Sequence, residues 1–425
     1  MDATVSGKCR VDACFALPGS KSIAARALLL AGLSRCPTQL SNIPACRDFE
    51  VMLEAVRGLG FNCRMDRAAG ALYVQGAAGR VPACGARLSV EDSGTALRLL
   101  SAVCTLGKGR FTIDGSRRLR ERPVKPLCDA LNRLGAHVSC SGGGAPVVVD
   151  ANGLSGGETD VDCSSSSQFL SALLVAGAFS RRGVRLLVRG LVSRPYVQVT
   201  LDLLERFGIG AGCEWGRSPG IDFFEVASAG VLEPAQIHLT IESDASSAGY
   251  FFAASALCSG GVKVEALGAG SLQADVQFVD VLARMGAQVR KGPDYIEVQG
   301  TGKLVGIEVD MSDLPDSVPV LAAIAPFAST PTLIKNVAHL RLKESDRLAA
   351  LQEELARCGV AVEAGPDWLR VNPSRVRPGR VRSHGDHRIA MAMAVLGLRT
   401  GNLTIEGAEC VAKSFPEFFK YMERL

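Results

Sequence analysis

The sequence predicts an α/β protein made of six copies of one βαβαββ unit, arranged in two domains. An Ala/Leu-rich helix, opened by a short cap of Gly, Ser or Asp, recurs roughly every 70–80 residues. Each such helix is followed by a β-like segment, a second and amphipathic helix, and further strand-like stretches. A chain of 425 residues is also long for one hydrophobic core, so two domains are expected.

Small polar residues open the first helix of every copy. Hydroxyl and carboxylate side chains can accept hydrogen bonds from the free amides of a helix start, and Gly lets a ligand approach the backbone. A helix start also carries a partial positive charge, so it favours anions. With Lys or Arg near several of them, these openings indicate a protein that binds phosphates and carboxylates. The six openings are Gly19–Ser22, Asp92–Thr95, Ser164–Ser167, Asp244–Ser247, Pro315–Ser317 and Gly385–Arg388.

The rest of each copy can be followed along the chain. Gly or Pro turns precede the β-like segments, and Gly often ends the second helix. The expected strands after the first helices are Thr38–Ile43, Gly109–Asp114, Gly183–Arg189, Gly261–Ala266, Thr330–Val337 and Asn402–Ile405. The expected second helices are Phe49–Leu59, Val124–Leu134, Tyr196–Phe207, Val276–Met285, Ser345–Cys358 and Phe415–Leu425. Because the first helices are Ala-rich all round, we expect them to be buried and the second helices to lie outside.

The sixth copy ends on its second helix and lacks a closing hairpin. An open sheet edge needs a cover, and the strand-like segment Lys8–Leu17 is the expected one. The chain would then cross between domains twice, near Leu17–Gly19 and near Ile237–Ile241. We therefore expect one domain over residues 19–238 and a second over residues 1–18 plus 239–425.

Composition excludes several classes of function. The net charge is only +4 and charges of both signs are interleaved, which argues against nucleic-acid binding. The 14 cysteines are scattered with no C-x-x-C pair, and no signal peptide is evident, so reduced thiols and a cytoplasmic location are expected. The longest apolar stretches are too short to span a bilayer. Neither a Walker loop nor a dinucleotide fingerprint occurs, and the histidine spacing does not fit zinc, so no cofactor or metal is expected.

Charged residues near the helix openings in the first half of the chain are candidate ligand contacts. Lys21 and Arg26 lie about one turn apart, and both could face one anion rather than solvent. In the run Arg117–Arg122, Arg122-Pro123 at a helix entrance would present a rigid guanidinium, although such runs are often solvated loops. The segment Ser164–Gln168 could bind a polyol or phosphate, or could simply cap a helix.

The second half carries a denser set of charges. Lys343 and Arg347 are four residues apart, so a helix would place them on one face with Glu344 between them. A carboxylate among cations can shuttle a proton, although a surface salt-bridge cluster is the alternative. Asp316 at the start of an apolar helix could be an ionised cap or, among cations and a substrate hydroxyl, a general base. Arg388 and Lys413 add cations at two more helix starts.

Taken together, these motifs resemble the 5-enolpyruvylshikimate-3-phosphate (EPSP) synthase family, in order and with consistent spacing from about residue 17 to 420. The matching segments are Leu17–Ser22 with Arg26, Ser93–Ala96 with Arg98, Arg120–Pro123, Ser166–Leu170, Ser193–Tyr196, Lys343–Arg347, Asp386–Arg388 and Lys413–Pro416. The resemblance implies a two-domain inverted α/β barrel-like fold with three subunits in each domain, which close over ligands in the cleft between them.

The resemblance also implies the reaction and its residues. The enolpyruvyl group of phosphoenolpyruvate would pass to the 5-hydroxyl of shikimate-3-phosphate by addition and elimination of phosphate, in the shikimate pathway to aromatic amino acids. The implied catalytic residues are Asp316 at the hydroxyl, Glu344 at the methylene carbon, and Lys21 and Lys413. The implied shikimate-3-phosphate contacts are Lys21, Ser22, Arg26, Ser166, Ser167, Gln168, Ser193, Asp316 and Lys343. The implied phosphoenolpyruvate contacts are Lys21, Gly94, Arg122, Gln168, Arg347, Arg388 and Lys413.

Three positions depart from the pattern of the family, and at one of them Leu99 replaces the Pro that is common there. His339 stands four residues before Lys343, where Asn is usual, and its charge would vary near neutral pH. Asp92 stands where Asn is usual and brings a negative charge towards the phosphoenolpyruvate contacts. Gly94 is retained, so glyphosate, which mimics phosphoenolpyruvate in this family, should still bind.

Two alternatives remain open. The sister enzymes that use UDP-N-acetylglucosamine carry a Cys five residues before the Arg-Pro pair, and Arg117 occupies that position here. A non-catalytic anion-binding protein of the same fold is the other alternative, although Asp316, Glu344 and Lys21 are all present. We expect a monomer that binds these small molecules, with no nucleic-acid or membrane partner.

Overall fold

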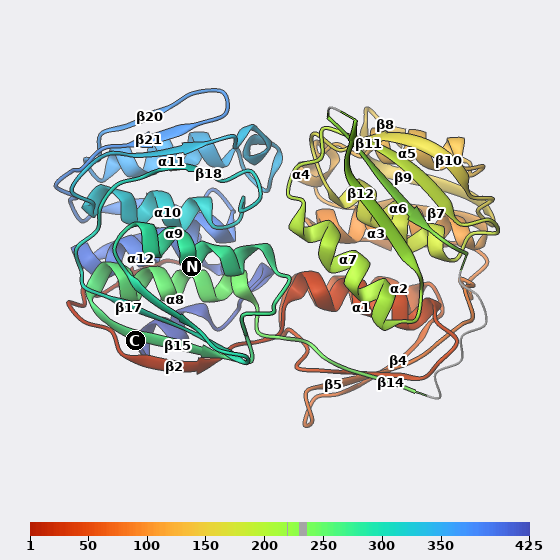
Figure 1. Cartoon of the computed structure of the whole chain (residues 1–425), viewed down its shortest axis with the longest axis horizontal. Coiled ribbons are helices and arrows are strands. Elements are labelled where there is room, and N and C mark those ends of the chain that lie inside the picture. The colour runs from red at the N-terminus through yellow and green to blue at the C-terminus, as the bar shows by residue number, and fades with distance from the viewer. Residues whose placement is uncertain (219, 229–235) are drawn as a thin grey trace. The chain divides into compact units, whose positions relative to one another are not determined.

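The computed structural model describes residues 1–218, 220–228 and 236–425. The chain divides into two compact units. Unit 1 consists of Met1–Pro18 and Glu242–Leu425, and unit 2 consists of Gly19–Ile241. Each unit holds three of the six sheets found in the described residues (Figure 1). The prediction of six α/β copies is confirmed by this arrangement.

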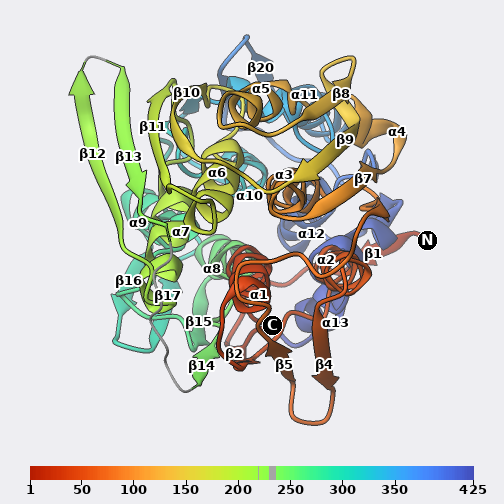
Figure 2. The ribbon, with the colours of Figure 1, turned by 90° about the vertical axis from the view of Figure 1, so that its right-hand side faces the viewer.

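In unit 2, three first helices lie at the centre and three sheets surround them (Figure 2). The first helices are α1 (Lys21–Leu33), α3 (Gly94–Val103), extended by η1 (Cys104–Leu106), and α6 (Gln168–Ala178). The second helices are α2 (Arg47–Gly58), α5 (Lys125–Arg133) and α7 (Pro195–Arg206), and the short α4 (Arg117–Arg120) precedes α5.

The three sheets of unit 2 share one strand order. In each, a parallel pair is followed by an antiparallel hairpin, and in the second and third sheets the strands before and after the first helix form the parallel pair. The first sheet contains β14 (Ile237–Thr240), β3 (Thr38–Ser41), β5 (Ala71–Gln75) and β4 (Asn62–Asp66). The second contains β6 (Ala86–Ser89), β7 (Lys108–Asp114), β9 (Gly144–Asn152) and β8 (Val138–Ser141). The third contains β10 (Gly157–Asp162), β11 (Val184–Arg189), β13 (Ile221–Val226) and β12 (Ala211–Ser218).

Unit 1 repeats this plan with shorter strands. Its first helices are α8 (Ala245–Cys258), α10 (Val318–Ile324), extended by η3 (Ala325–Phe327), and α12 (His387–Thr400). Its second helices are η2 (Ala274–Gln277) with α9 (Phe278–Arg284), α11 (Arg347–Arg357) and α13 (Phe418–Glu423), and η4 (Ala338–Leu342) and η5 (Ala408–Lys413) precede the last two.

Two of the three sheets of unit 1 contain a strand from the N-terminal segment. The first contains β2 (Ala13–Ala16), β15 (Gly260–Glu265), β17 (Tyr295–Gly300) and β16 (Gln288–Lys291). The second contains β18 (Glu308–Asp310), β19 (Thr332–Lys335), β21 (Leu369–Val371) and β20 (Val362–Ala364). The third has only β22 (Arg380–Arg382), β23 (Leu403–Glu406) and β1 (Ala3–Val5).

The cover expected for the sixth copy was assigned to the wrong residues. The segment Lys8–Leu17 contributes β2, which pairs in parallel with β15 of the fourth copy (Figure 1). The three residues of β1 instead pair antiparallel with β23 and cover the sixth sheet. The reason is an exchange of strands: β2 precedes α1 in the chain but supplies the first strand of the fourth copy, and β14 precedes α8 but pairs with β3 of the first copy.

Burial follows the composition of the helices. Within α12, every residue from His387 to Leu398 is buried, and α6 is buried from Phe169 to Ala178. The second helices bury one face only; α5, for example, buries Leu127, Cys128, Ala130 and Leu131. Each fully buried Leu or Phe contributes roughly 1.5–3 kcal/mol, so the central helices anchor each unit and hold their N-terminal residues in place. In the described part of the chain, no helix has the length and apolar character needed to cross a membrane.

Candidate active site

In unit 2, the start of α1 carries two cations with different partners. Lys21 Nζ donates to Asp48 Oδ2 at 2.7 Å, and this pair is largely shielded from solvent. Arg26 is buried, and its guanidinium donates to Thr200 Oγ1 at 2.8 Å, Ser171 Oγ at 3.2 Å and the Ser22 carbonyl at 2.9 Å. Burial lowers the pKa of Arg26 to about 10, which leaves it charged at neutral pH. A buried cation without a described ion-pair partner favours an anion nearby.

The start of α6 brings together the predicted hydroxyl and amide groups. Ser166 Oγ accepts a hydrogen bond from the backbone amide of Gln168 at 3.2 Å, and the neighbouring Ser167 is buried. The side chain of Gln168 is itself oriented by two residues of α3, because its Oε1 accepts from Arg98 at 2.7 Å and its Nε2 donates to Thr95 Oγ1 at 2.9 Å. The amide group is therefore held in one orientation.

Ser193 precedes α7 in a left-handed backbone conformation. Its φ is 53°, and the residue is buried. Non-glycine residues adopt this conformation rarely, and they do so mostly where the surrounding structure requires it. The position of Ser193 is thus fixed by the turn rather than by its own preference.

At the start of α3, Gly94 lies directly against Arg122. A Cβ atom on Gly94 would come within 2.7 Å of the Arg122 Cζ atom and within 2.9 Å of both terminal nitrogens. Arg122 is buried, whereas Arg117, Arg118 and Arg120 of the same run are more exposed and face Glu121 or Asp114. The one member of the run predicted to present a guanidinium is therefore the buried one, against a helix N-terminus.

In unit 1, Asp316 lies between two buried arginines. Its Oδ1 accepts from Arg347 at 2.9 Å, and its Oδ2 accepts from Arg388 at 3.0 Å. Burial opposes ionisation of this carboxyl, but the charges of Arg388, Arg347 and Lys343 outweigh it and hold the pKa of Asp316 far below its usual range. Asp316 is a carboxylate at neutral pH.

Arg347 is the centre of a wider group of carboxylates. It is 1% exposed, and it donates to Glu344 Oε2 at 3.0 Å and to Asp386 Oδ2 at 2.8 Å as well as to Asp316. Burial opposes the positive charge, yet Asp386, Glu344 and Asp316 together raise the pKa of Arg347 above its ordinary value. The arrangement brings the two predicted proton-transfer residues, Asp316 and Glu344, to one guanidinium.

The expectation that one helix stacks Lys343 and Arg347 was wrong. Helix α11 begins at Arg347 with Asp346 as its N-cap, whose side chain accepts from the Ala349 amide. Lys343 precedes the helix in extended backbone at the end of η4. The two cations still act on the same carboxylate, because the charge of each lowers the pKa of Asp316.

The expectation for His339 was also wrong. His339 is 6% exposed, and burial together with the charge of Lys343 lowers the pKa of its imidazole to about 3. The ring is therefore neutral throughout the neutral pH range. Among the described residues, its Nε2 atom has no hydrogen-bond partner.

Lys413, the remaining predicted cation, is half-buried at the last position of η5. Asp92, another departure from the family pattern, is exposed, and its carboxylate accepts a hydrogen bond from Ser116.

Sequence reasoning missed three acidic residues that the structure places at these sites. Asp48 is the partner of Lys21, and Asp386 is that of Arg347. Asp275 is buried and accepts from Ser317 at 2.7 Å and Ser246 at 2.8 Å; burial and the charge of Asp316 raise its pKa. Of the three, Asp386 had a signal, since it belongs to the matching segment Asp386–Arg388 and is the N-cap two residues before Arg388. The others come from distant segments without a recognisable motif.

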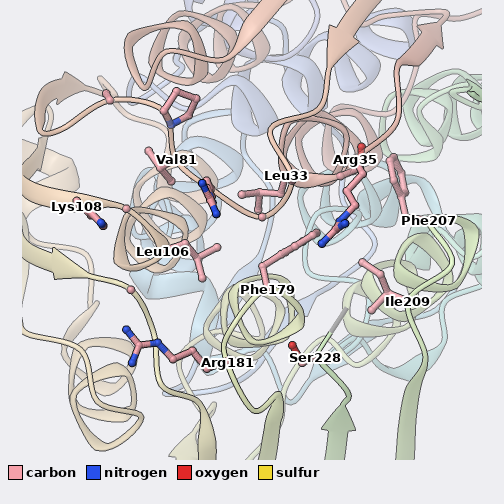
Figure 3. A pocket seen from close by; sticks show the side chains of 18 of the residues that line it. Leu33, Arg35, Val81, Leu106, Lys108, Phe179, Arg181, Phe207, Ile209 and Ser228 are labelled. Carbon is pink, nitrogen blue, oxygen red and sulfur yellow. The ribbon is translucent and has the colours of Figure 1, made fainter. Parts of the chain in front are cut away.

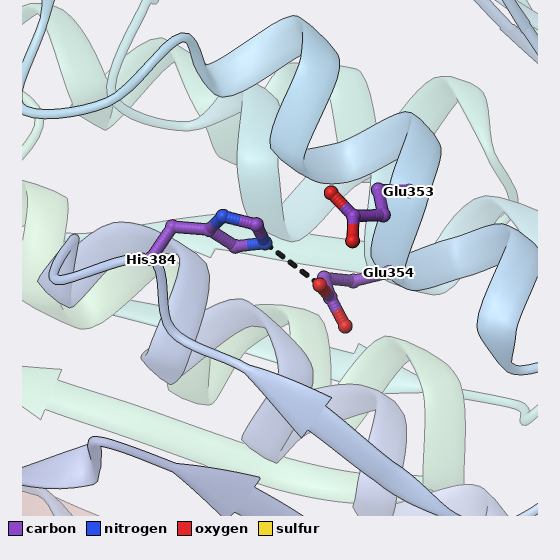
Figure 4. Close-up of side chains that lie close together, drawn as sticks. All are labelled: Glu353, Glu354 and His384. Atoms are coloured by element: carbon purple, nitrogen blue, oxygen red, sulfur yellow. Dashed lines mark hydrogen bonds and ion pairs between the residues drawn. The ribbon is translucent and has the colours of Figure 1, made fainter.

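Glu353, Glu354 and His384 form a separate acidic group in unit 1, and their possible ligand atoms lie within 4.8 Å of one another (Figure 4). These atoms already form hydrogen bonds with other groups of the protein. Glu354 accepts from His384 Nε2 at 2.7 Å and from the Arg382 amide at 3.0 Å, while Glu353 accepts from Arg357 at 2.7 Å. The group is explained by these contacts.

Comparison with solved structures gives the class of the protein. The chain matches EPSP synthase from Acinetobacter baumannii with a TM-score of 0.80 at 26% identity, covering 100% of this chain and 97% of the other. An enolpyruvyl transferase from Streptomyces tendae shares the fold, with a TM-score of 0.77 at 20% identity over 99% of this chain and 96% of the other. The chain therefore has the fold of the enolpyruvyl transferases.

The sequence comparisons identify the family within this class. A family model described as EPSP synthase (3-phosphoshikimate 1-carboxyvinyltransferase) matches residues 5–422. Proteins named 3-phosphoshikimate 1-carboxyvinyltransferase from a Shewanella species and from Nostoc punctiforme are 39% and 40% identical to this chain. The alignments cover 96% of this chain in both cases, and 96% and 95% of the two relatives. The chain belongs to the EPSP synthase family.

Proposed function

We propose that this protein transfers the enolpyruvyl group of phosphoenolpyruvate to the 5-hydroxyl of shikimate-3-phosphate and releases inorganic phosphate. The observation that carries the proposal is the group formed by Asp316, Arg347 and Arg388 in a chain of this family. Arg347 and Arg388 are buried and flank the ionised carboxylate of Asp316. The guanidinium of Arg347 also donates to Glu344. This set can hold anions and move protons at one place.

Both units would contribute to binding of the two substrates. From unit 2 we propose Lys21, Ser22, Arg26, Ser166, Ser167, Gln168 and Ser193 for shikimate-3-phosphate, with Lys21, Gly94, Arg122 and Gln168 for phosphoenolpyruvate. From unit 1 we propose Asp316 and Lys343 for shikimate-3-phosphate, with Arg347, Arg388 and Lys413 for phosphoenolpyruvate. The hydroxyl groups and the oriented Gln168 amide suit a polyol, and planar guanidinium groups suit carboxylate and phosphate.

The reaction needs one proton removed from the 5-hydroxyl and one added to the methylene carbon of phosphoenolpyruvate. We assign the first step to Asp316 and the second to Glu344. In the structure without substrates, the low pKa of Asp316 makes it a weak base because Arg347 and Arg388 stabilise its charge. Anionic substrates that bind these arginines would compete for their charge and raise the pKa of Asp316. Substrate binding would thereby activate the base.

The elimination step expels phosphate from the tetrahedral intermediate. Cations that are already in place stabilise the developing negative charge without reorganisation, and such stabilisation is usually a large part of catalysis. We assign this role to Lys21 and Lys413, together with Arg122, Arg347 and Arg388. Buried guanidinium groups such as Arg122 and Arg388 act more strongly than exposed ones because water screens them less.

The position of Arg117 favours this acceptor over UDP-N-acetylglucosamine. In the sister enzymes a Cys is expected there, and here the side chain is a guanidinium that is 97% exposed. It cannot supply a thiol to that chemistry.

The test is release of inorganic phosphate from phosphoenolpyruvate with each acceptor in turn. We expect turnover with shikimate-3-phosphate and none with UDP-N-acetylglucosamine, together with inhibition by glyphosate that competes with phosphoenolpyruvate. Turnover only with the nucleotide sugar would contradict the acceptor assignment. Absence of turnover with both would favour a non-catalytic anion-binding protein. We further propose that the protein is cytoplasmic and monomeric. Size-exclusion chromatography with light scattering would test the oligomeric state.

A further inference from the structure

A large cavity lies at the opposite end of the central helices of unit 2 from the proposed substrate contacts. Its volume is about 800 Å³, and residues of all three copies line it (Figure 3). Lys21, Gly94 and Gln168 begin α1, α3 and α6, whereas Leu33, Leu106 and Phe179 at the cavity stand at or directly after the ends of α1, η1 and α6. A helix of the length of α1 spans roughly 20 Å at 1.5 Å per residue, so the cavity is a separate place on the unit.

The lining repeats one pattern three times. Each central helix ends with an apolar residue, and a cation follows two positions later: Leu33 and Arg35, Leu106 and Lys108, Phe179 and Arg181. Figure 3 shows Leu33, Leu106 and Phe179 near the middle of the view, with the three cations around them. Arg80 adds a fourth cation, and among the lining residues that the structure describes there is no Asp or Glu.

The side chains of the four cations at the cavity form no hydrogen bond or ion pair with other described residues. Among the residues that the structure describes, none of Arg35, Arg80, Lys108 and Arg181 has a side-chain hydrogen bond or an ion pair. Several other exposed cations of unit 2 are paired, although Arg67 and Arg87 are not paired in the described part of the chain; Arg206 donates to Asp202 at 2.7 Å, and Arg120 donates to Asp114 at 2.6 Å. Four unpaired positive charges around one cavity repel one another, which an anion would relieve.

Hydrogen bonds to the last carbonyl groups of the helices do not explain these cations. Cations near a helix C-terminus can bond the last carbonyl groups or offset the helix dipole. Here backbone amides already serve the carbonyls: Ala77 donates to Gly32 at 2.8 Å, Gly79 to Leu33 at 2.7 Å and Gly153 to Gly107 at 3.0 Å.

Unit 1 offers an internal comparison, because its first helices make the same connection to a following strand. The residues two positions after the ends of these helices are Gly260, Ser329 and Asn402, and none is Lys or Arg. Only α12 has a basic residue in its last turn, Arg399. The shared fold therefore does not require a cation after each central helix, and the pattern is a property of unit 2.

We propose that this cavity is a binding site for a small organic anion with a flat apolar body, such as an aromatic carboxylate or sulfonate. The apolar side chains at the helix ends, with Phe207 and Ile209, would contact the ring, and the cations would bind the acidic group. The volume lies within the usual range for small-molecule sites, which combine an apolar lining with a few polar groups. The proposal is independent of the proposed function, because none of the lining residues is assigned to the substrates.

Naphthalene-1-sulfonate is a suitable probe, and isothermal titration calorimetry of the full-length protein measures its binding. The key variant is Lys108→Gln with Arg181→Gln. The matched control is Arg67→Gln with Arg87→Gln, which removes the same charge from two exposed residues of unit 2 outside the cavity. We expect the first pair to weaken binding by on the order of tenfold or more and the control pair by less than about twofold.

Two further measurements complete the test. The neutral analogue 1-naphthalenemethanol should bind on the order of tenfold more weakly than the sulfonate, and saturating shikimate-3-phosphate should leave probe binding unchanged. Equal affinity in both double variants, displacement of the probe by shikimate-3-phosphate, or absence of binding would each overturn the proposal. Phosphate release by the Lys108→Gln/Arg181→Gln variant should equal that of the parent, which separates this site from the proposed reaction.

Discussion

At the scale of single residues, the charge state of Asp316 is set by its neighbours rather than by its burial. Burial alone would favour the neutral acid, but Arg347 and Arg388 keep the carboxylate ionised. The sequence identified all three residues, and it did not predict that the arginines hold the carboxylate directly. That contact joins residues 31 and 72 positions from Asp316 in the chain, so no local pattern reports it.

Asp316→Asn tests the role of this carboxylate. We expect the turnover number to fall by roughly 10²–10⁴ while the KM for shikimate-3-phosphate changes little, because the amide keeps a polar contact but cannot accept the proton. Steady-state phosphate release measures both constants. Asp310→Asn is the matched control, since Asp310 is exposed and its contacts are to Asn336 and Ser312. An Asp316→Asn enzyme as active as the control would contradict the assignment.

His339 makes stability depend on pH in a definite direction. The unfolded chain binds a proton at this imidazole near pH 6.5, whereas the folded chain does so only near pH 3. The free energy of unfolding therefore falls as the pH is lowered from 6.5, by about 2 kcal/mol at pH 5 from this residue alone. In His339→Gln this contribution is absent, so the loss of stability between pH 7 and pH 5 should be smaller by that amount. Urea unfolding of both proteins at the two pH values measures it, and equal losses would contradict the low pKa.

Gly94→Ala tests the proximity of α3 to Arg122. The new methyl group would displace the Arg122 guanidinium, so we expect the KM for phosphoenolpyruvate to rise by on the order of tenfold and inhibition by glyphosate to weaken. The KM for shikimate-3-phosphate should change by less than about twofold. Stability should not suffer, because Ala favours a helix over Gly by roughly 1 kcal/mol. Gly210→Ala is the control, since no atom lies within 4 Å of the place its new methyl group would take; if it behaves like Gly94→Ala, the steric explanation is wrong.

At the scale of elements, the exchange of β2 and β14 decides which segments stabilise which unit. The repeated order of strands and helices was readable from the sequence because apolar periodicity and Gly turns mark each element. The partner of an N-terminal strand was not readable, since several sheets have an open edge of similar composition. Ala3–Val5 is also only three residues long, too short to stand out from its surroundings.

Deletion of residues 1–5 tests the place of β1. Loss of this strand exposes the edge of β23, where Ala3 faces Ile405 and Val5 faces Leu403. We expect faster amide hydrogen exchange in Leu403–Glu406 and lower stability of unit 1, with exchange in the sheets of unit 2 unchanged. Deletion of residues 1–2 alone is the control, because it keeps all three β1 residues. Unchanged protection of β23 in the longer deletion would contradict the pairing.

At the scale of the whole molecule, residues of both units are assigned to the same pair of small anions. The resemblance to the family implied this assignment, and several of the matching segments stand at helix starts, which recur in every copy of the fold. The sequence could not predict the acidic partners. Lys21 with Asp48 and Arg347 with Asp386 are already paired in the structure. If the proposed assignment holds, substrate anions compete with these carboxylates, and binding exchanges one set of ion pairs for another.

The most direct measurement is a crystal structure of the protein with shikimate-3-phosphate and glyphosate bound together. We expect one molecule of each, with Lys21 and Arg122 of unit 2 and Lys343 and Arg388 of unit 1 all within hydrogen-bond distance of the two ligands. Ligands that contact only one of the two units, or that leave Asp316 without a contact to the 5-hydroxyl, would contradict it.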